Sequence, residues 1–341
     1  MRIAYLLAWP ELGGGTKVVF QHAEILVRHA HRVTVFGQGP RPAWLDSPIA
    51  YADWTRETTF PSQDLVVATY YSTLDLARRL AMGPVAHFCQ GFEGWLAHLA
   101  SEHAAIEEAY SLPLPALAVS PHLAALLAER FARESRLAPP PVDPLFAPAW
   151  RLRPRSRPWI VVPGIFEAPV KGVATALRAV ARLRAAGRKC RVLRVSALPL
   201  SREETEILRP DQYLCAAAPQ EVASAVRHCD LLLFPSAREE GFGLPLLEAM
   251  AAKVPVVASD IPSVRFASDG AVALVGEGDD ESMAAAAGEL LARPPRWRAA
   301  RRAGFVASRR FTAERVAPQL LAAVEWAAER AVSLPAPVGS R

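Results

Sequence analysis

The chain has 341 residues, of which 51% are hydrophobic and 21% charged, and its mean hydropathy is +0.12. This length suits two domains better than one and supplies a core for each, which excludes disordered, collagenous and disulfide-stapled proteins. The net charge is +5, but no basic stripe is interleaved with aromatic residues, so we expect a solvated surface and no nucleic-acid partner.

The minor residue types narrow the setting of the protein. Its four cysteines form no C-x-x-C pair and do not cluster with histidines, which predicts neither a zinc site nor a disulfide framework and favours a reducing compartment. No apolar stretch reaches the ~20 residues of a membrane span, so we expect a cytoplasmic protein, with peripheral membrane contact left open by the basic charge. The 30 prolines and the lack of asparagine lead us to hypothesise a thermophilic source.

Short apolar runs alternate with helical patterns along nearly the whole chain, which is typical of parallel sheets with crossover helices. In the first half we expect strands at residues 3–8, 33–36, 65–69, 85–89 and 116–120, and helices at 16–30, 72–81, 95–110 and 121–132. In the second half we expect strands at 159–162, 191–195, 212–215, 231–234, 254–258 and 271–275, and helices at 172–186, 220–228, 244–252, 281–292 and 313–331.

The stretch from residue 138 to residue 158 separates the two halves. It carries seven prolines and four arginines, which predicts an interdomain linker. We therefore expect an α/β fold of two doubly wound, Rossmann-like domains, residues 1–147 and 148–311, facing each other across a cleft. A helix at 312–332 would pack back toward the first domain, before a flexible tail at 333–341. Such sheets bind ligands beyond the carboxyl ends of their strands, so function should lie in the loops that follow strands.

The loop after the strand at 231–234 carries the most informative motif. Glu240 is followed by Gly241, Phe242 and Gly243, and a helix begins at Leu244 with a proline in its first turn. The glycines let backbone amides approach a ligand, and the positive end of the helix dipole favours an anion such as a diphosphate.

Two glutamates flank this predicted anion site. Glu248 lies about one helical turn beyond the start of the helix, so both Glu240 and Glu248 are expected to overlook the pocket. Carboxylates are poor partners for phosphate but good acceptors for the hydroxyl groups of a sugar or a ribose. The pattern therefore predicts a ligand with a diphosphate between two polyhydroxylated rings.

The run from Glu240 to Glu248, EGFGLPLLE, resembles the signature of the family 4 retaining glycosyltransferases of the GT-B fold. The resemblance implies that residues 241–244 and Lys171 bind the donor diphosphate, that Glu248 binds the ribose and that Glu240 contacts the transferred sugar. Lys171 precedes Gly172 as the family's lysine–glycine pair does, and a lysine can act as a compact point charge on a leaving group.

One departure from the family concerns a cation. The family usually has an arginine after the glycine that ends the first strand of the second domain, whereas Ile165 follows Gly164 here. Either Arg238 or another arginine substitutes, or the leaving group is stabilised differently.

The loop near the amino terminus contains Gly13, Gly14 and Gly15, and it resembles the family's glycine-rich loop, whose backbone approaches the donor sugar and phosphate. Three glycines after a strand are weak evidence by themselves. A dinucleotide-binding loop would need a third glycine where Val18 stands, so a nicotinamide oxidoreductase is disfavoured.

Three polar residues surround the end of the strand at 85–89. Gln90 stands roughly where many relatives have a histidine, so a contact with the transferred sugar or the acceptor is expected there. Glu93 is a second candidate for this pocket. His87 is a third, although a packed and hydrogen-bonded strand histidine is the favoured interpretation.

The leading hypothesis is a retaining, metal-independent transfer of a sugar from a nucleoside-diphosphate donor to a hydroxyl of a glycan, a lipid-linked or a small-molecule acceptor. Glu240 and Lys171 would be the catalytic residues, and no cofactor or metal is expected. A nucleotide-sugar epimerase or hydrolase on the same scaffold stays open. So does a non-catalytic nucleotide-sugar-binding protein, because Ile165 replaces an expected cation.

Overall fold

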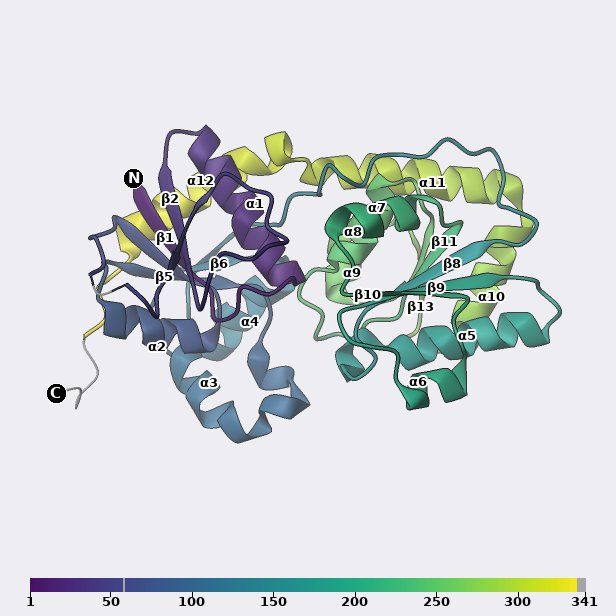
Figure 1. The fold of residues 1–341 in the computed structure, drawn as a ribbon, viewed down its shortest axis with the longest axis horizontal. Helices are drawn as coiled ribbons and strands as arrows, with labels where there is room; N and C mark the ends of the chain where they lie inside the picture. Colours follow the sequence, from purple (N-terminus) through teal and green to yellow (C-terminus); the bar gives the residue numbers. More distant parts are fainter. Residues whose placement is uncertain (58, 336–341) are drawn as a thin grey trace. The chain divides into compact units, whose positions relative to one another are not determined.

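The computed structural model describes residues 1–57 and 59–335. The chain forms two compact units, which Figure 1 shows with their elements labelled: unit 1 is Met1–Pro141 with Ala313–Arg341, and unit 2 is Val142–Thr312. The chain thus passes from unit 1 to unit 2 and returns. The first passage lies at Pro141–Val142, whereas the sequence predicted that the first domain would end at residue 147.

Unit 1 is built on a parallel sheet of order β3-β2-β1-β4-β5-β6-β7. Its strands are β1 Arg2–Leu6, β2 Arg32–Gly37, β3 Ala50–Asp53, β4 Leu65–Ala68, β5 Val85–Cys89, β6 Ala116–Ala118 and β7 Ser135–Leu137. Its helices are α1 Gly14–Arg28, α2 Tyr71–Leu80, α3 His103–Tyr110, α4 Pro121–Phe131 and α12 Ala313–Arg330, with 3-10 turns η1 Glu93–Trp95 and η2 Ala97–Glu102.

Unit 2 repeats the arrangement with a parallel sheet of order β10-β9-β8-β11-β12-β13. Its strands are β8 Trp159–Pro163, β9 Arg191–Ser196, β10 Gln212–Cys215, β11 Leu231–Phe234, β12 Val256–Ser259 and β13 Ala273–Val275. Its helices are α5 Val173–Ala185, α6 Arg202–Ile207, α7 Pro219–Arg227, α8 Leu244–Ala251, α9 Pro262–Ser268, α10 Asp280–Ala292 and α11 Pro294–Ser308, with 3-10 turns η3 Pro169–Lys171 and η4 Arg309–Phe311.

The strand order confirms the expected pair of doubly wound α/β domains. In each sheet the chain first adds strands on one side of the first strand and then crosses to the other side. The order therefore reverses between β1 and β4 in unit 1 and between β8 and β11 in unit 2. Ligands of such sheets bind outside the carboxyl ends of the strands at this reversal.

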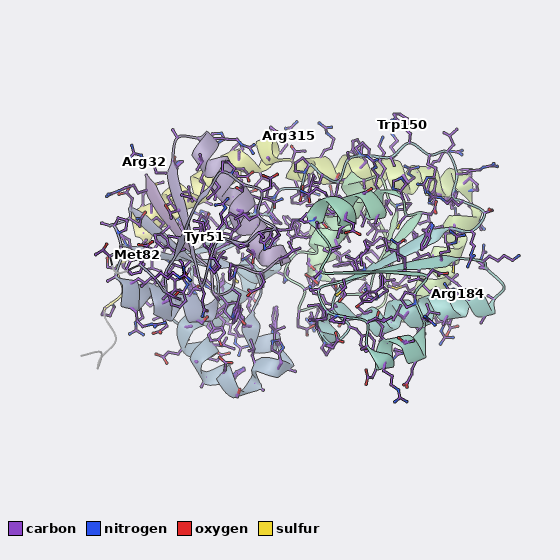
Figure 2. The ribbon with its side chains drawn as sticks, in the orientation of Figure 1. Arg32, Tyr51, Met82, Trp150, Arg184 and Arg315 are labelled. Carbon is purple, nitrogen blue, oxygen red and sulfur yellow. The ribbon has the colours of Figure 1, made fainter. Side chains whose placement is uncertain are left out.

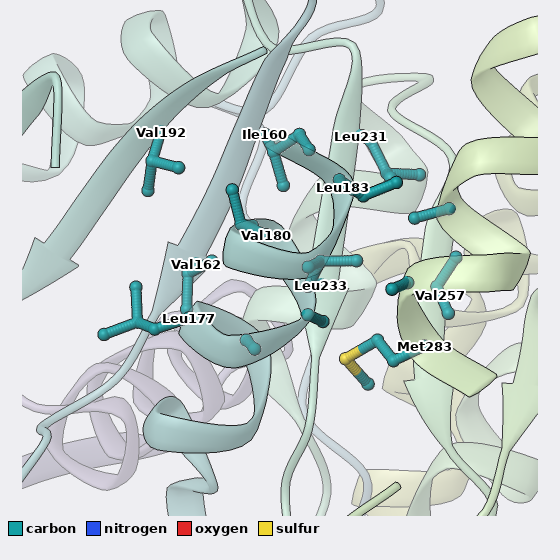
Figure 3. Close-up of a cluster of buried hydrophobic side chains, with 14 of the residues drawn as sticks. Ile160, Val162, Leu177, Val180, Leu183, Val192, Leu231, Leu233, Val257 and Met283 are labelled. Atoms are coloured by element: carbon teal, nitrogen blue, oxygen red, sulfur yellow. The ribbon is translucent and has the colours of Figure 1, made fainter. Parts of the chain in front are cut away.

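The core of unit 2 explains why its strands read as nearly continuous apolar runs. Side chains of β8, β9 and β11 pack against α5 and α10, and Figure 3 shows this cluster, which includes Ile160, Leu177, Val192, Leu233 and Met283. A parallel sheet buried on both faces leaves few positions where polar residues are tolerated. Arg194 in the middle of β9 is an exception, because it is fully buried.

The last helix belongs to unit 1, as its neighbours show. α12 packs against α1, β6 and β7, and it contains Pro318. The backbone N–H of Val85 then donates to the carbonyl of Val332, and Leu334 packs against a core cluster of the unit. The tail expected at 333–341 lies outside the described residues from residue 336 onward.

The structure corrects the expected helix at 95–110. Residues 93–102 instead form two 3-10 turns, and the α-helix begins only at His103. Leu96 has an extended backbone between the two turns, and Leu99 departs from helical geometry within the second. The short strands β3 and β7 and the helices α6, α9 and α11 were not among the expected elements, because their residues are too polar or too few to show a clear period.

Candidate functional site

The reversal of strand order in unit 2 brings two charged residues together. Lys171 ends η3, which follows β8, and Glu240 lies in the loop after β11. The ammonium nitrogen of Lys171 donates to the Oε2 atom of Glu240 over 2.8 Å. The structure therefore joins the two residues that the sequence analysis proposed as catalytic, at the edge of the sheet where ligands bind.

A glycine makes this approach of the two loops feasible. Gly172 has a φ of +59°, and a Cβ atom there would lie 2.1 Å from the carbonyl oxygen of Pro235. The backbone N–H of Ala237 also donates to the carbonyl of Val170 over 2.8 Å. Because the loop after β11 packs directly on the turn that contains Lys171, a side chain at residue 172 would separate them.

A second glycine sets the start of α8. Gly243 caps the helix with a φ of +93°, and a Cβ atom there would lie 3.1 Å from the ring of Phe234. Phe242 is buried, and its ring makes edge contacts with the rings of Phe266 and Phe311. The buried ring anchors the loop, so the amino terminus of α8 is held at the carboxyl edge of the sheet beside Glu240.

The exposure of the ion pair determines what it can bind. The side chain of Lys171 is 37% exposed, whereas that of Glu240 is 10% exposed. The lysine side chain is thus more than a third exposed while its carboxylate partner is nearly buried. An incoming anion could contact Lys171 from the open side, and Glu240 would remain beside it as an acceptor for hydroxyl groups. Glu248 is half-buried on α8.

A buried arginine supports the end of β8 and the loop after it through hydrogen bonds to the backbone. Arg194 donates through Nη2 to the carbonyl of Gly164 over 2.9 Å and through Nη1 to the carbonyl of Val162, and its Nε pairs with the carboxylate of Glu204. Both side chains are almost completely buried. Gly164 in turn has a φ of +119°, and a Cβ atom there would lie 3.1 Å from the Cβ of Lys171. Arg194 therefore fixes the backbone against which Lys171 packs.

The structure shows the surroundings of Ile165, where the family arginine is missing, and of the arginines that could replace it. Ile165 is half-buried, and Arg238 is exposed in the loop that carries Glu240. Arg194 contacts the same loop as Ile165, but its guanidinium is buried among carbonyls and a carboxylate. It supports the backbone of the loop and does not present a second cation to solvent. The sequence pattern does not indicate this role of Arg194.

Unit 1 places a different set of residues at its own reversal. Gly13 caps α1, which begins at Gly14, two residues earlier than expected. The side-chain amide of Gln90 lies against Gly15, because a Cβ atom on that glycine would be 3.2 Å from both its oxygen and its nitrogen. The structure thus brings the glycine-rich loop after β1 together with Gln90 after β5.

His87 does not belong to that group, which corrects its place among the pocket candidates. It is fully buried, and its Nδ1 lies 3.2 Å from the Nη1 of Arg133. Burial, followed by the charge of Arg133, holds the pKa of His87 well below its ordinary value. The residue is a neutral, packed strand histidine.

Glu93 is also turned to the interior of unit 1. It is 7% exposed, and its carboxylate accepts a hydrogen bond of 2.6 Å from the hydroxyl of Tyr110. Burial raises the pKa of Glu93 to about 7, although the hydrogen bond from Tyr110 opposes the shift. Glu93 therefore does not line an open pocket, but it is a carboxyl group that titrates near neutral pH.

Two aromatic residues at this edge were not among the candidates. Trp9 follows β1 and Tyr70 follows β4, and their rings meet edge to face with centroids 4.9 Å apart. Trp9 is 54% exposed. Their position directly after the two strands that flank the reversal is a signal that sequence reasoning could have used.

Comparisons with known proteins find glycosyltransferases. Residues 157–293 match the family model described as "Glycosyl transferases group 1". A D-inositol 3-phosphate glycosyltransferase of Segniliparus rotundus is 38% identical over 109 residues, which cover 31% of this chain and 24% of that protein. A phosphatidyl-myo-inositol mannosyltransferase of Mycolicibacterium smegmatis is 34% identical over 143 residues, which cover 39% of this chain and 36% of that protein.

Solved structures extend the likeness of fold to the whole chain. Sucrose-phosphate synthase from Thermosynechococcus elongatus has a TM-score of 0.75 at 18% identity, covering 96% of this chain and 98% of that one. Anabaena HepE in complex with UDP and glucose has a TM-score of 0.78 at 15% identity, covering 95% of this chain and 99% of that one. Residues 157–293 are thus similar to the group 1 glycosyltransferases, and the chain as a whole has the two-domain fold of these solved structures, which is the expected GT-B fold.

The two units of the chain differ in how far the sequence likeness to known proteins reaches. Lys171, Glu240 and Glu248 lie within the matched residues 157–293, whereas the glycine-rich loop and Gln90 lie outside them. The chain spans only about a quarter to a third of the length of the curated relatives cited above. The expected resemblance to family 4 fits these relatives. None of the helices in the described part of the chain is long and apolar enough to cross a membrane.

Proposed function

We propose that this chain is a glycosyltransferase that moves a sugar from a nucleoside-diphosphate donor to an acceptor hydroxyl, with retention at the anomeric carbon and without a metal ion. The observation that carries the proposal is the contact of 2.8 Å between Lys171 and Glu240 at the reversal of strand order, beside the amino terminus of α8. A cation and a helix dipole suit a diphosphate, and the nearby carboxylates suit the sugar and ribose hydroxyls.

The residues of unit 2 take separate roles in this proposal. Lys171 and the backbone of residues 241–244 bind the diphosphate, Glu240 accepts from a hydroxyl of the transferred sugar, and Glu248 accepts from the ribose. As the bond between the anomeric carbon and the phosphate oxygen breaks, negative charge grows on the leaving diphosphate. Lys171 and the dipole of α8 stabilise that charge, which is the work that a divalent cation performs in other enzymes.

Retention would follow from attack on the same face of the sugar. The acceptor oxygen forms its bond to the anomeric carbon on the side from which the diphosphate departs. The proton of the acceptor hydroxyl passes to an oxygen of the leaving phosphate, so no protein group has to form a covalent intermediate. In this scheme Glu240 orients the sugar and is not the nucleophile.

We assign acceptor binding to unit 1. The supporting observations are the packing of Gln90 on Gly15 and the edge contact of Trp9 with Tyr70 after β1 and β4. An exposed indole beside a phenol offers an apolar face with polar edges, which suits a hydroxylated acceptor. The glycine-rich loop at residues 13–15 would approach the donor sugar and phosphate, as the family resemblance implies.

The first experiment identifies the donor. Thermal unfolding is measured with UDP, GDP, ADP and dTDP and with their sugars, because a ligand that binds only the folded state raises the melting temperature by mass action. We expect one base to stand out, and we expect the Lys171→Ala variant to lose most of its shift. No shift with any of these compounds would contradict the proposed donor class.

The second experiment tests the reaction. The preferred donor is incubated with a panel of acceptors, in the presence and absence of EDTA, and products are identified by mass spectrometry and anomeric NMR. We expect a glycosylated acceptor with retained configuration and the same rate with EDTA. Free or isomerised sugar without any transfer would instead favour a hydrolase or an epimerase, and binding without turnover would favour a non-catalytic protein.

A further inference from the structure

We propose that unit 2 docks on an anionic phospholipid bilayer through one face, formed by residues 148–158 and α11, which we call the arginine face. Three large apolar side chains project from it: Trp150 is 91% exposed, Leu152 is 75% exposed and Val306 is 61% exposed. Figure 2 shows Trp150 at the outside of the molecule. Large apolar groups that are this exposed and close together mark interaction surfaces.

Hydrogen bonds hold the two segments of the arginine face together. Arg301 of α11 donates to the carbonyl of Arg151 over 2.6 Å and to the carbonyl of Lys253 over 2.6 Å. Arg298 donates to the carbonyl of Leu152 over 3.0 Å. The chain segment with the exposed Trp150 and Leu152 is thus fixed along α11, so the apolar side chains form one surface and not a loose loop.

Cations surround these apolar side chains. The ammonium nitrogen of Lys253 lies 4.8 Å from the centre of the Trp150 ring and 4.5 Å from that of Phe305. Residues 148–158 and α11 each contain four arginines and no acidic residue. Some of these arginines serve the fold, since Arg151 and Arg155 pair with the buried Asp230. Arg301 is also buried, and Arg157 and Arg296 pair with Asp211 and Glu289.

The exposed charge of the arginine face is concentrated on a few side chains. Arg153, Arg298 and Arg302 are all exposed. A hollow of about 620 Å³ adjoins the linker, and Arg153, Arg155, Arg157 and Arg191 line it together with a serine, a proline and a tryptophan. A hollow of this composition suits the phosphate group of a lipid headgroup.

The combination of residue types selects a bilayer over other polyanions. Arginines alone would suit a nucleic acid, but that partner gives no reason to expose Leu152 and Val306. Tryptophan prefers the interface between headgroups and acyl chains, where neighbouring leucine and valine side chains can enter the apolar region. Arginines near such a surface are attracted to anionic lipids. One partner, an anionic bilayer, thus accounts for both the exposed apolar side chains and the arginines of the arginine face.

The position of this face is compatible with a working donor loop in the same unit. Lys253 directly follows α8, and the N–H of Ala149 donates to the carbonyl of Ala252. The arginine face therefore contacts the carboxyl end of α8, while the loop of Glu240 is at the amino end, roughly 12 Å away for a helix of this length. The proposal does not rest on sugar transfer.

The experiment is co-sedimentation of the full chain with vesicles of phosphatidylcholine alone or with 30% phosphatidylglycerol, without donor or acceptor. We expect binding to the anionic vesicles that weakens at high salt. The Trp150→Ala/Leu152→Ala variant should lower the partition coefficient about 10-fold or more, because two apolar anchors are removed. Leu198→Ala/Leu200→Ala, which shortens two exposed leucines elsewhere in unit 2, is the matched control and should bind as the unchanged protein does.

A second pair of variants tests the charges. Arg153→Glu/Arg302→Glu should abolish binding to the anionic vesicles, whereas Arg202→Glu/Arg209→Glu, with the same change of net charge on α6 and the loop after it, should retain most of it. Melting temperatures confirm that each variant is folded. The proposal is overturned if anionic vesicles do not bind the chain, if the two charge pairs weaken binding equally, or if Trp150→Ala/Leu152→Ala leaves vesicle binding unchanged.

Discussion

The two units share one strand order but differ in what they place where that order reverses. In unit 2 a lysine pairs with a glutamate there, and glycines allow the two loops to pack closely. Unit 1 sets a glutamine against a glycine and a tryptophan against a tyrosine at the corresponding edge. The sheet thus determines where a ligand binds, and the loop residues determine its chemistry.

The units also differ in how each uses a buried charge. In unit 2 the buried guanidinium of Arg194 faces a carboxylate and two carbonyls of the loop that leads to Lys171. In unit 1 the buried carboxyl of Glu93 faces the hydroxyl of Tyr110. The first arrangement supports a site, whereas the second gives the interior a group that titrates.

Arg194→Met should have the largest effect on stability. The variant leaves the carboxylate of Glu204 buried without its partner, which costs about 3–5 kcal/mol of unfolding free energy. Urea denaturation measures the loss. The double variant Arg194→Met/Glu204→Leu should regain most of the stability, because it removes both charges.

The double variant also separates support of the loop from stability alone. If Arg194 positions the loop, the double variant should bind the preferred nucleoside diphosphate less tightly, because Gly164 loses its guanidinium partner. Calorimetry at a temperature where both proteins are folded makes this comparison. Unchanged affinity would show that Arg194 stabilises unit 2 without shaping its site.

Lys171→Ala should have the largest effect on turnover. Removal of the cation that stabilises a developing negative charge lowers kcat/KM by about 10²–10³-fold, which is roughly 3–4 kcal/mol of transition-state stabilisation. The matched control is Lys189→Ala, which removes an exposed lysine elsewhere in unit 2. Steady-state kinetics with the donor found by thermal shift measure both. Equal rates in the two variants would remove the proposed role of Lys171.

Gly172→Ala tests whether the close contact of the two loops is required. A Cβ atom at 2.1 Å from the carbonyl of Pro235 cannot be accommodated without moving a loop, and the residue also has a positive φ. We expect a loss of about 3 kcal/mol in unfolding free energy together with a lower kcat.

Gly187→Ala is the matched control for that prediction. Gly187 has a φ of +79°, but a Cβ atom there meets nothing within 4 Å. It should cost only about 1 kcal/mol, from backbone strain, and leave turnover unchanged. Equal costs in the two variants would mean that positive φ, and not the contact with Pro235, decides the outcome at residue 172.

The sequence predicted the fold of both units and the position of the candidate site in unit 2. It did not predict the roles of the buried Arg194 and Glu93. The alternation of apolar runs and helices predicted both sheets, and the spacing of Glu240 and Glu248 located the loop after β11, because both signals are local in sequence. The role of Arg194 was not predicted, since a lone arginine in a strand gives no indication of the loops it will reach. The packed strand histidine favoured for His87 is confirmed, whereas the burial of Glu93 depends on packing from distant segments, which periodicity does not reveal.

The smallest effect is expected in unit 1, where Glu93→Gln tests the buried carboxyl. The pKa of Glu93 is raised from 4.5 to about 7, so the folded state binds a proton that the unfolded state releases between these two pH values. Its contribution to stability is therefore full below pH 4.5 and is lost as pH rises through 7. Between pH 5 and pH 8 this loss amounts to about 2 kcal/mol.

The change in unfolding free energy from pH 5 to pH 8 must be compared between Glu93→Gln and the unchanged protein, because other groups titrate in the same range. Burial lowers the pKa of His22 to about 4, which makes the folded state less stable as pH falls and so opposes the trend of Glu93. Urea denaturation at both pH values should give a difference between Glu93→Gln and the unchanged protein of the predicted size and sign. Identical pH dependence would show that Glu93 is ionised in the folded protein across this range, and it would then be a buried charge of unit 1 in addition to Arg133.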